Sequence, residues 1–147
     1  MNVPVYELTT SKDKLRYEFI SGGSKGQIRK IIEYTYLPDV GFWNLGFGDL
    51  EVTTGHISDS VVSDNGDGRK VLATVIRSML SFFNAYPAET IIFTGSDERR
   101  TRVYHRIAIQ YRNEFLSLLT IKGLTEYGLE EAIETDKSYL AFIIREA

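Results

Sequence analysis

Residues 65–97 read NGDGRKVLATVIRSMLSFFNAYPAETIIFTGSD, and this stretch decides the fold. Apolar side chains recur at helical spacing from Val71 to Tyr86, which predicts a helix with Asp67 at its N-cap. The apolar run at residues 90–93 follows, and its lack of alternation predicts a short strand that is covered on both faces. The stretch therefore predicts a helix followed by a central strand.

The spacing of the apolar residues changes where this part of the chain begins, from short strand-like segments to helical spacing. Upstream, short segments rich in β-branched and aromatic residues alternate with turn residues, at 16–20, 27–37, 42–47, 50–53 and 57–62. Downstream, a second helix is predicted to open at residues 94–97 and to run to about Leu119. Two strands, near 120–125 and 139–145, are predicted to close the chain. This order predicts an α+β fold, with a single mostly antiparallel sheet and two helices packed on one face.

Length and composition limit the classes of protein. At 147 residues the chain is expected to form one domain, residues 1–147. The absence of cysteine excludes disulfides, thiolate zinc sites and cysteine nucleophiles, and no cofactor or metal is indicated. No apolar run approaches membrane-spanning length and the first residues do not resemble a signal peptide, so a cytoplasmic protein without membrane contact is expected. A pI near 5.4 argues against strong non-specific binding of nucleic acid.

The second predicted helix breaks its own pattern at Arg100. At 100° per residue, Arg100 falls within the apolar stripe, whereas Arg99, Arg102 and Arg106 share the polar side. A cation in the first turn also has the wrong sign for the helix dipole. These two irregularities mark the start of this helix as a candidate site.

A bound anion would account for Arg100, which could grip it with two hydrogen bonds while the backbone at the helix start adds partial positive charge. Lys70 would join if the two helix starts lie at one edge of the sheet. The candidate ligand-binding residues are Thr94, Gly95, Ser96, Arg100, Arg102, Lys70 and Lys25. Two alternatives stay open: Arg100 extends into solvent, or it pairs with an internal carboxylate, for which the candidates are Asp49, Glu51 and Asp67.

Other motifs favour ordinary structural roles. Ser24-Lys25-Gly26 lacks the spacing of a Walker loop and precedes a strand, which favours a β-turn. Residues 65–68 lack the alternating acids of a calcium loop, so they favour a turn with a helix cap. His56 and His105 are expected at the surface. Asp49 and Glu51 could hold Mg²⁺ from one face of a strand, but a solvated acidic face is the favoured interpretation.

Several separated motifs resemble a family of short bacterial proteins known only as a domain of unknown function. They are Phe19-Ile20-Ser21, Ser24-Lys25-Gly26, Phe47-Gly48-Asp49, Val62-Ser63-Asp64-Asn65-Gly66-Asp67, Lys70-Val71-Leu72-Ala73-Thr74-Val75, Thr94-Gly95-Ser96 and Arg100-Thr101-Arg102-Val103-Tyr104. The resemblance covers nearly the whole chain but assigns no activity. It implies an intracellular bacterial protein, of a kind that often comes from mobile or defence-related gene pairs.

Three functions remain in competition, and the sequence leaves open whether the protein is an enzyme. The leading hypothesis is a module that binds a phosphate-bearing ligand, a nucleotide or RNA. Exposed arginines at 99, 102 and 106, with Lys25, Arg29 and Lys30 elsewhere, could form an electrostatic track for RNA. The second is a protein-interaction module, a homodimer or one half of a toxin–antitoxin or defence-related pair, suggested by aromatic residues at 34, 36, 42 and 43. The third is a Mg²⁺-dependent nuclease that uses Asp49, Glu51 and Asp67.

Overall fold

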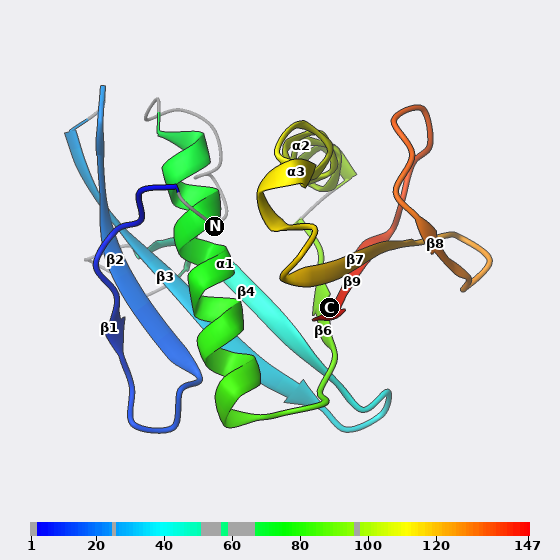
Figure 1. Ribbon diagram of the computed structural model, residues 1–147, viewed down its shortest axis with the longest axis horizontal. Coiled ribbons are helices and arrows are strands. Elements are labelled where there is room, and N and C mark those ends of the chain that lie inside the picture. The colour runs from blue at the N-terminus through cyan, green and yellow to red at the C-terminus, as the bar shows by residue number, and fades with distance from the viewer. Residues whose placement is uncertain (1–2, 25, 51–56, 59–66, 96–97) are drawn as a thin grey trace. The chain divides into compact units, whose positions relative to one another are not determined.

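The computed structural model describes residues 3–24, 26–50, 57–58, 67–95 and 98–147 (Figure 1). Within these ranges the strands are β1 (Thr9–Thr10), β2 (Arg16–Gly23), β3 (Gly26–Leu37), β4 (Phe42–Leu50), β5 (Ile57–Ser58), β6 (Ile91–Phe93), β7 (Leu119–Leu124), β8 (Glu130–Ala132) and β9 (Ala141–Glu146). The helices are α1 (Gly68–Ala85), α2 (Glu98–Gln110) and α3 (Arg112–Phe115). The predicted strands at 50–53 and 57–62 fall mostly outside the described residues.

Hydrogen bonds join the strands in the order β1-β2-β3-β4-β6-β9-β7-β8, with β5 paired to β4. β4 and β6 run parallel, whereas β1–β2, β2–β3, β4–β5, β6–β9, β7–β8 and β7–β9 run antiparallel. The predicted α+β class and the mostly antiparallel sheet are therefore confirmed. The packing of two helices on one face of the sheet stays a prediction.

The chain divides into two compact units. The first contains Met1–Thr35 and Gly46–Pro87, and the second contains Tyr36–Leu45 and Ala88–Ala147. The first unit holds β1, β2, β5 and α1, and the second holds β6, β9, β7, β8, α2 and α3. β3 and β4 contribute residues to both units.

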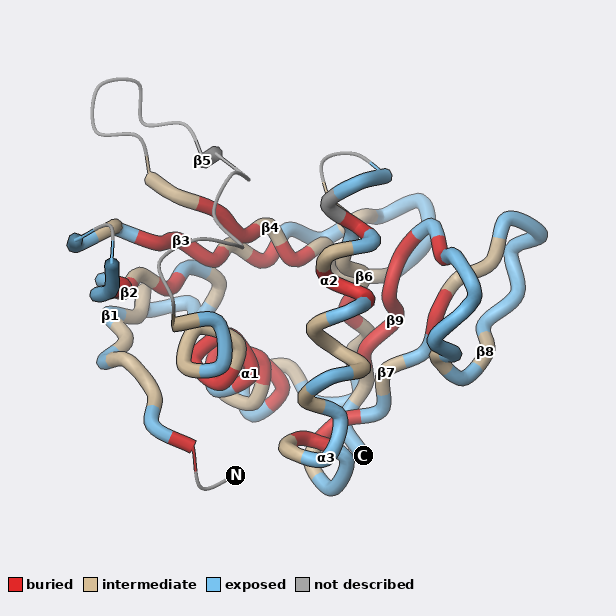
Figure 2. Tube along the Cα trace, turned by 90° about the horizontal axis from the view of Figure 1, so that it is seen from above, coloured by how far each residue is buried: buried red, intermediate tan, exposed pale blue. Residues whose placement is uncertain are grey.

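In the first unit, α1 lies against β2 and β3 with its apolar side facing the strands (Figure 2). The hydroxyl groups of Tyr34 and Ser78 are 2.8 Å apart, and Tyr17 donates to Ser81 Oγ at 3.0 Å. The ring of Tyr34 stacks on Phe82 with centroids 4.5 Å apart. Tyr34 is 3% exposed, so it is a core residue and cannot serve the surface interface that the sequence suggested for it.

Tyr34 should make the protein sensitive to alkali. Burial raises the pKa of Tyr34 far above its ordinary value of 10.0, and the hydrogen bond with Ser78 only partly opposes this. The unfolded chain therefore ionises first as pH rises, so the stability is complete below about pH 10 and falls above it. Urea midpoints measured from pH 7 to 11 should show this fall, and Tyr34→Phe should make it less steep. Tyr127→Phe, at a position that is 81% exposed, should leave the slope unchanged.

The second unit is built around β6, which lies between β4 and β9. Ile91 in β6 is fully buried, as the prediction of a central strand requires. α2 packs on this strand through Tyr104, whose ring meets Phe93 edge-on with centroids 4.6 Å apart. The single long helix predicted here is wrong: α2 ends at Gln110, and α3 follows after Tyr111. After Tyr111 the backbone forms tighter bonds between residues three apart, from the Glu114 N–H to the Tyr111 carbonyl oxygen and from the Leu118 N–H to the Phe115 carbonyl oxygen, both at 2.9 Å, and β7 starts at Leu119.

His105 is buried, at 8% exposure, which corrects the prediction of a surface histidine. Its ring meets Tyr139 edge-on with centroids 5.1 Å apart. Helical angles alone place His105 on the polar side of α2, but the segment between β8 and β9 covers that side. Arg112 fastens this segment by donating to the carbonyl oxygen of Ile133 at 2.8 Å. The segment between β8 and β9 therefore buries His105, which the helical pattern alone would leave exposed.

Candidate functional site

The predicted anion site at the start of α2 is partly occupied by the chain itself. The backbone N–H of Gly95 donates to Thr101 Oγ1 at 3.0 Å, and Thr101 is buried. Thr94 is exposed, and Arg102 is exposed as predicted. Arg100 lies in the first turn of α2, but its side chain is outside the described residues, as are Ser96 and Lys25. The N–H group that was expected to bind an anion is thus engaged within the chain.

Lys70 belongs to the first unit, whereas the described α2 residues of the predicted site belong to the second. Their joint participation in one site stays a prediction. Lys70 has well-defined neighbours of its own at the start of α1, and these neighbours form a different polar group.

Asp67 occupies the N-cap position of α1, as predicted, but its carboxylate does not cap the helix. Instead, Asp67 Oδ2 accepts hydrogen bonds from Tyr6 Oη at 2.5 Å and from Ser21 Oγ at 2.5 Å. Ser21 is fully buried. The acid therefore ties the helix start to the N-terminal segment and to β2.

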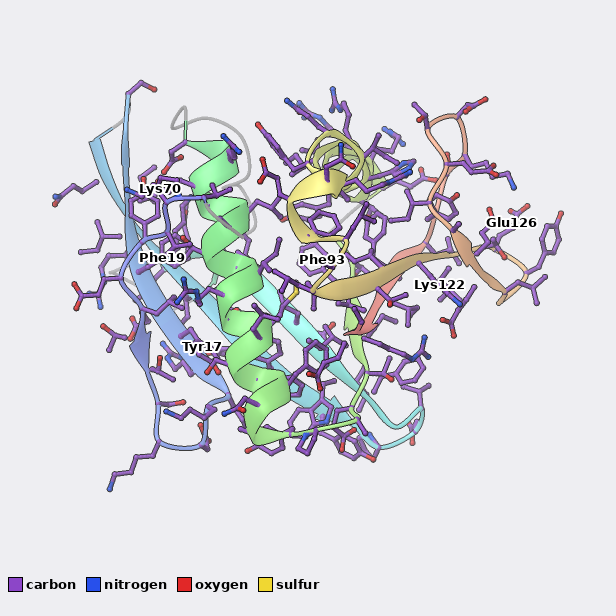
Figure 3. The ribbon with its side chains drawn as sticks, viewed as in Figure 1. Tyr17, Phe19, Lys70, Phe93, Lys122 and Glu126 are labelled. Atoms are coloured by element: carbon purple, nitrogen blue, oxygen red, sulfur yellow. The ribbon has the colours of Figure 1, made fainter. Side chains whose placement is uncertain are left out.

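Tyr6 fastens the N-terminal segment to this end of α1. Its backbone N–H donates to Thr74 Oγ1 at 2.8 Å, and its hydroxyl accepts from the N–H of Gly22 at 3.0 Å. The Lys70 ammonium lies 4.1 Å from the centroid of the Tyr6 ring, a cation–π contact. Burial, and then the hydrogen bond to Asp67, raises the pKa of Tyr6, so its hydroxyl keeps its proton at neutral pH. Figure 3 shows Lys70 near the start of α1, with Phe19 below it on β2.

A stack of aromatic rings leads from Tyr6 into the sheet. Phe19 stacks on Tyr6 with centroids 5.5 Å apart and on Phe47 with centroids 6.3 Å apart. Phe19 is also the cross-strand partner of Lys30 on β3. Because directly opposed residues of antiparallel strands point to the same face, Lys30 lies beside this stack and under α1.

Lys30 is 1% exposed, and its ammonium lies 2.8 Å from Asp49 Oδ1. Its assignment to an exposed basic track is therefore wrong. The missed signal is the alternation of β3, in which Lys30 occupies the position between Ile28 and Ile32 on one face of the strand. A charged residue within an apolar alternation breaks the same kind of rule that marked Arg100 on the second helix.

We call these residues the α1 polar cluster: Tyr6, Ser21, Lys30, Asp49, Asp67 and Lys70. All of them lie in the first unit. The charge of Asp49 is compensated by Lys30, and Asp67 accepts two hydroxyl hydrogen bonds. Within the described part of the chain, no three acidic or histidine side chains converge as metal ligands, and Glu51 lies outside it.

The comparisons with known proteins place the chain in a family. The model of DUF6934, a family of unknown function, matches residues 2–147. The chain belongs to this family. The resemblance predicted from the separated motifs is thereby confirmed, and it extends over almost the entire sequence. The searches of curated proteins and of solved structures found no match. Among the described residues, no helix has both the length and the apolar character needed to cross a bilayer.

Proposed function

We propose that the protein binds a phosphate-bearing ligand, a nucleotide or RNA, at the α1 polar cluster. The observation that carries this proposal is the position of Lys70 in the first turn of an 18-residue helix, with its ammonium group over the ring of Tyr6. Helix N-termini favour anions because their first N–H groups and the macrodipole both present positive charge. We expect the protein to be cytoplasmic, where nucleotides and RNA occur.

The charges at the helix start support an anionic ligand. The first turn of α1 contains Arg69 and Lys70 and no acidic residue, and the Asp67 carboxylate at the N-cap is bound to the hydroxyl groups of Tyr6 and Ser21. Cations at this end oppose the helix dipole at a cost of about 0.3–1 kcal/mol each. A phosphate group would reverse this cost, because it interacts favourably with the lysine and with the helix start.

The neighbours of Lys70 favour a nucleotide or RNA over a simple anion. The Lys70 ammonium lies over the ring of Tyr6, 4.1 Å from its centroid, and both residues are only partly buried. Sites that bind nucleic-acid strands combine cations that pair with the phosphates and aromatic side chains near them.

A thermal-shift comparison of Lys70→Gln with Arg77→Gln tests the proposal. Arg77 is an exposed cation on the same helix, so its replacement removes an equal charge away from the cluster. A nucleotide or short RNA at ~100 times its dissociation constant should add about 2.7 kcal/mol, or roughly 5–10 °C, to the wild type. Arg77→Gln should keep this shift and Lys70→Gln should lose most of it.

The ligand class is identified by measuring the thermal shift separately with inorganic phosphate, mononucleotides, triphosphates and short RNA. The absence of a shift with all of them in the wild type would overturn the proposal. A thermal shift that is kept in Lys70→Gln and lost in Arg100→Gln would place the binding site at the start of α2.

A further inference from the structure

The second unit carries a row of exposed arginines on α2. Arg99, Arg102 and Arg106 are exposed and lie within 60° of one another around the helix axis, at 100° per residue. No ion pair of these three arginines occurs within the described residues. We call this group the arginine face.

A surface of opposite charge lies on β8 and its two flanking turns, in the same unit. Five acidic residues against two lysines occur in residues 122–137, and the acids are Glu126, Glu130, Glu131, Glu134 and Asp136. Arg145 pairs with Glu130, and Lys137 pairs with both Glu131 and Glu134. An excess of negative charge remains after these pairs. We call these five acids the acidic hairpin.

Large apolar side chains are exposed next to the five residues of the acidic hairpin. Tyr127 is 81% exposed and Leu129 is 64% exposed, in the turn that joins β7 to β8. Figure 3 shows Glu126 in this turn, directed away from α2. An exposed tyrosine bordered by carboxylates suits a guanidinium group, which can stack on the ring while it pairs with an acid.

We infer that a second copy of this chain occupies both surfaces, so that the arginine face of each protomer binds the acidic hairpin of the other. Two reciprocal contacts of this kind close into a symmetric dimer and do not extend into a fibre. Opposite surface charges also steer the two copies into register. This inference is independent of the proposed phosphate site, whose residues all lie in the first unit.

Charge reversal tests the dimer through sedimentation velocity and native mass spectrometry. The wild type should dimerise at low salt and dissociate as salt is raised, because exposed charges are screened beyond ~10 Å at 0.1 M. R102E/R106E makes both surfaces acidic, and E126K/E134K makes both basic, so each variant alone should be monomeric. An equimolar mixture should recover a mixed dimer, since both contacts then join opposite charges.

K12E/R77E is the matched control, because it makes the same change in net charge at exposed positions of the first unit. It should dimerise like the wild type. If circular dichroism shows that a double variant does not fold, the mixing experiment is done with the single variants Arg102→Glu and Glu126→Lys. A wild type that is monomeric at low salt, a dimer that survives the reversals, or a mixture that stays monomeric would each refute the inference.

Discussion

Asp49→Asn should lower the free energy of unfolding by up to about 3 kcal/mol, the lower end of the range for removing one partner of a buried ion pair, because Lys30 is buried whereas the Asp49 side chain is 23% exposed. The substitution keeps the shape of the side chain but deletes the negative charge 2.8 Å from the Lys30 ammonium. Lys30 is 1% exposed, so water cannot replace that charge without opening the space between the sheet and α1. Urea unfolding at pH 7, extrapolated linearly to water, measures the loss.

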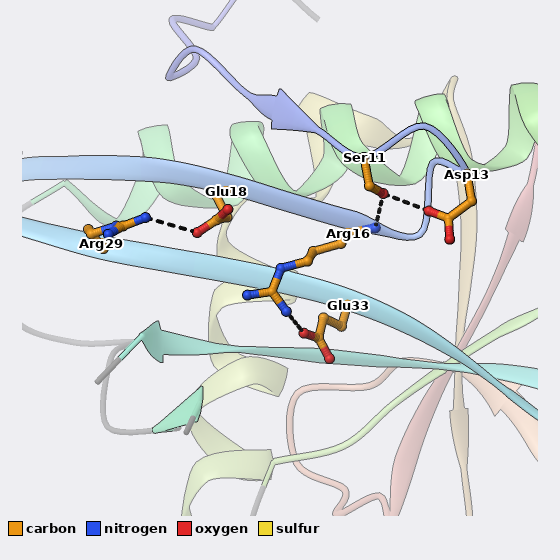
Figure 4. Close-up of polar contacts among 6 residues, drawn as sticks. All are labelled: Ser11, Asp13, Arg16, Glu18, Arg29 and Glu33. Atoms are coloured by element: carbon orange, nitrogen blue, oxygen red, sulfur yellow. Dashed lines mark hydrogen bonds and ion pairs between the residues drawn. The ribbon is translucent and has the colours of Figure 1, made fainter. Parts of the chain in front are cut away.

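The exposed ion pairs on the same two strands provide the control. Arg29 pairs with Glu18 at 3.2 Å on the surface of the β2–β3 hairpin, where Arg16 also pairs with Glu33 (Figure 4). Glu18→Gln should change stability by less than about 1 kcal/mol, because water solvates the remaining arginine.

A second substitution separates the loss of charge balance from a loss of packing. Lys30→Met in the Asp49→Asn background removes the buried ammonium that has lost the Asp49 carboxylate, and it should recover part of the stability, since a buried pair can often be replaced by apolar groups. An Asp49→Asn protein as stable as Glu18→Gln would show that the pair contributes no more than an exposed one.

Gly123→Ala should destabilise the protein by about 3 kcal/mol, at the upper end of the range for overpacking. A Cβ at Gly123, the residue before the last one of β7, would overlap the ring of Tyr139. That ring cannot move aside easily, because its hydroxyl accepts the N–H of Glu134 at 2.9 Å and donates to the carbonyl oxygen of Ala132 at 3.2 Å. His105 packs against the ring as well.

A double-mutant cycle tests this explanation. In a Tyr139→Leu background the ring is gone, so Gly123→Ala should cost much less than in the wild type, with a coupling of about 1–3 kcal/mol. Gly22→Ala is the control, because a Cβ there meets no atom within 4 Å and the residue also lies in a strand. If Gly123→Ala costs the same in both backgrounds, the ring is not the cause, and the low conformational preference of glycine for strands must be considered instead.

Periodic segments of the sequence predicted most of the secondary structure. The helix after Asp67 and the apolar strand before Thr94 occur where the pattern places them, as α1 and β6. The helix shows a strong period because it buries one continuous face, and the strand is marked by an unbroken apolar run because both of its faces are covered. Strands β1 and β8 were missed, because segments of two and three residues are too short to show a period and these two also lack an apolar run.

The candidate site was predicted less well than the fold. Lys70 was among the predicted ligand-binding residues, but Tyr6, Ser21 and Lys30 were not. Tyr6 and Asp67 are 61 residues apart in sequence, and Ser21 and Asp67 are 46 apart. No local pattern reports such contacts, because they depend on how the N-terminal segment and β2 meet the start of α1.

The sequence by itself determined the α+β class, the mostly antiparallel sheet, the family and the exposed arginines of α2. These depend on periodicity and motif order, which are local properties of the chain. Only the tertiary structure decided that Lys30 and His105 are buried, that Asp67 binds Tyr6 and Ser21, and that Gly95 is bonded to Thr101. The physical reason is that burial and hydrogen-bond partners depend on which elements cover a side chain, and those elements come from distant parts of the sequence.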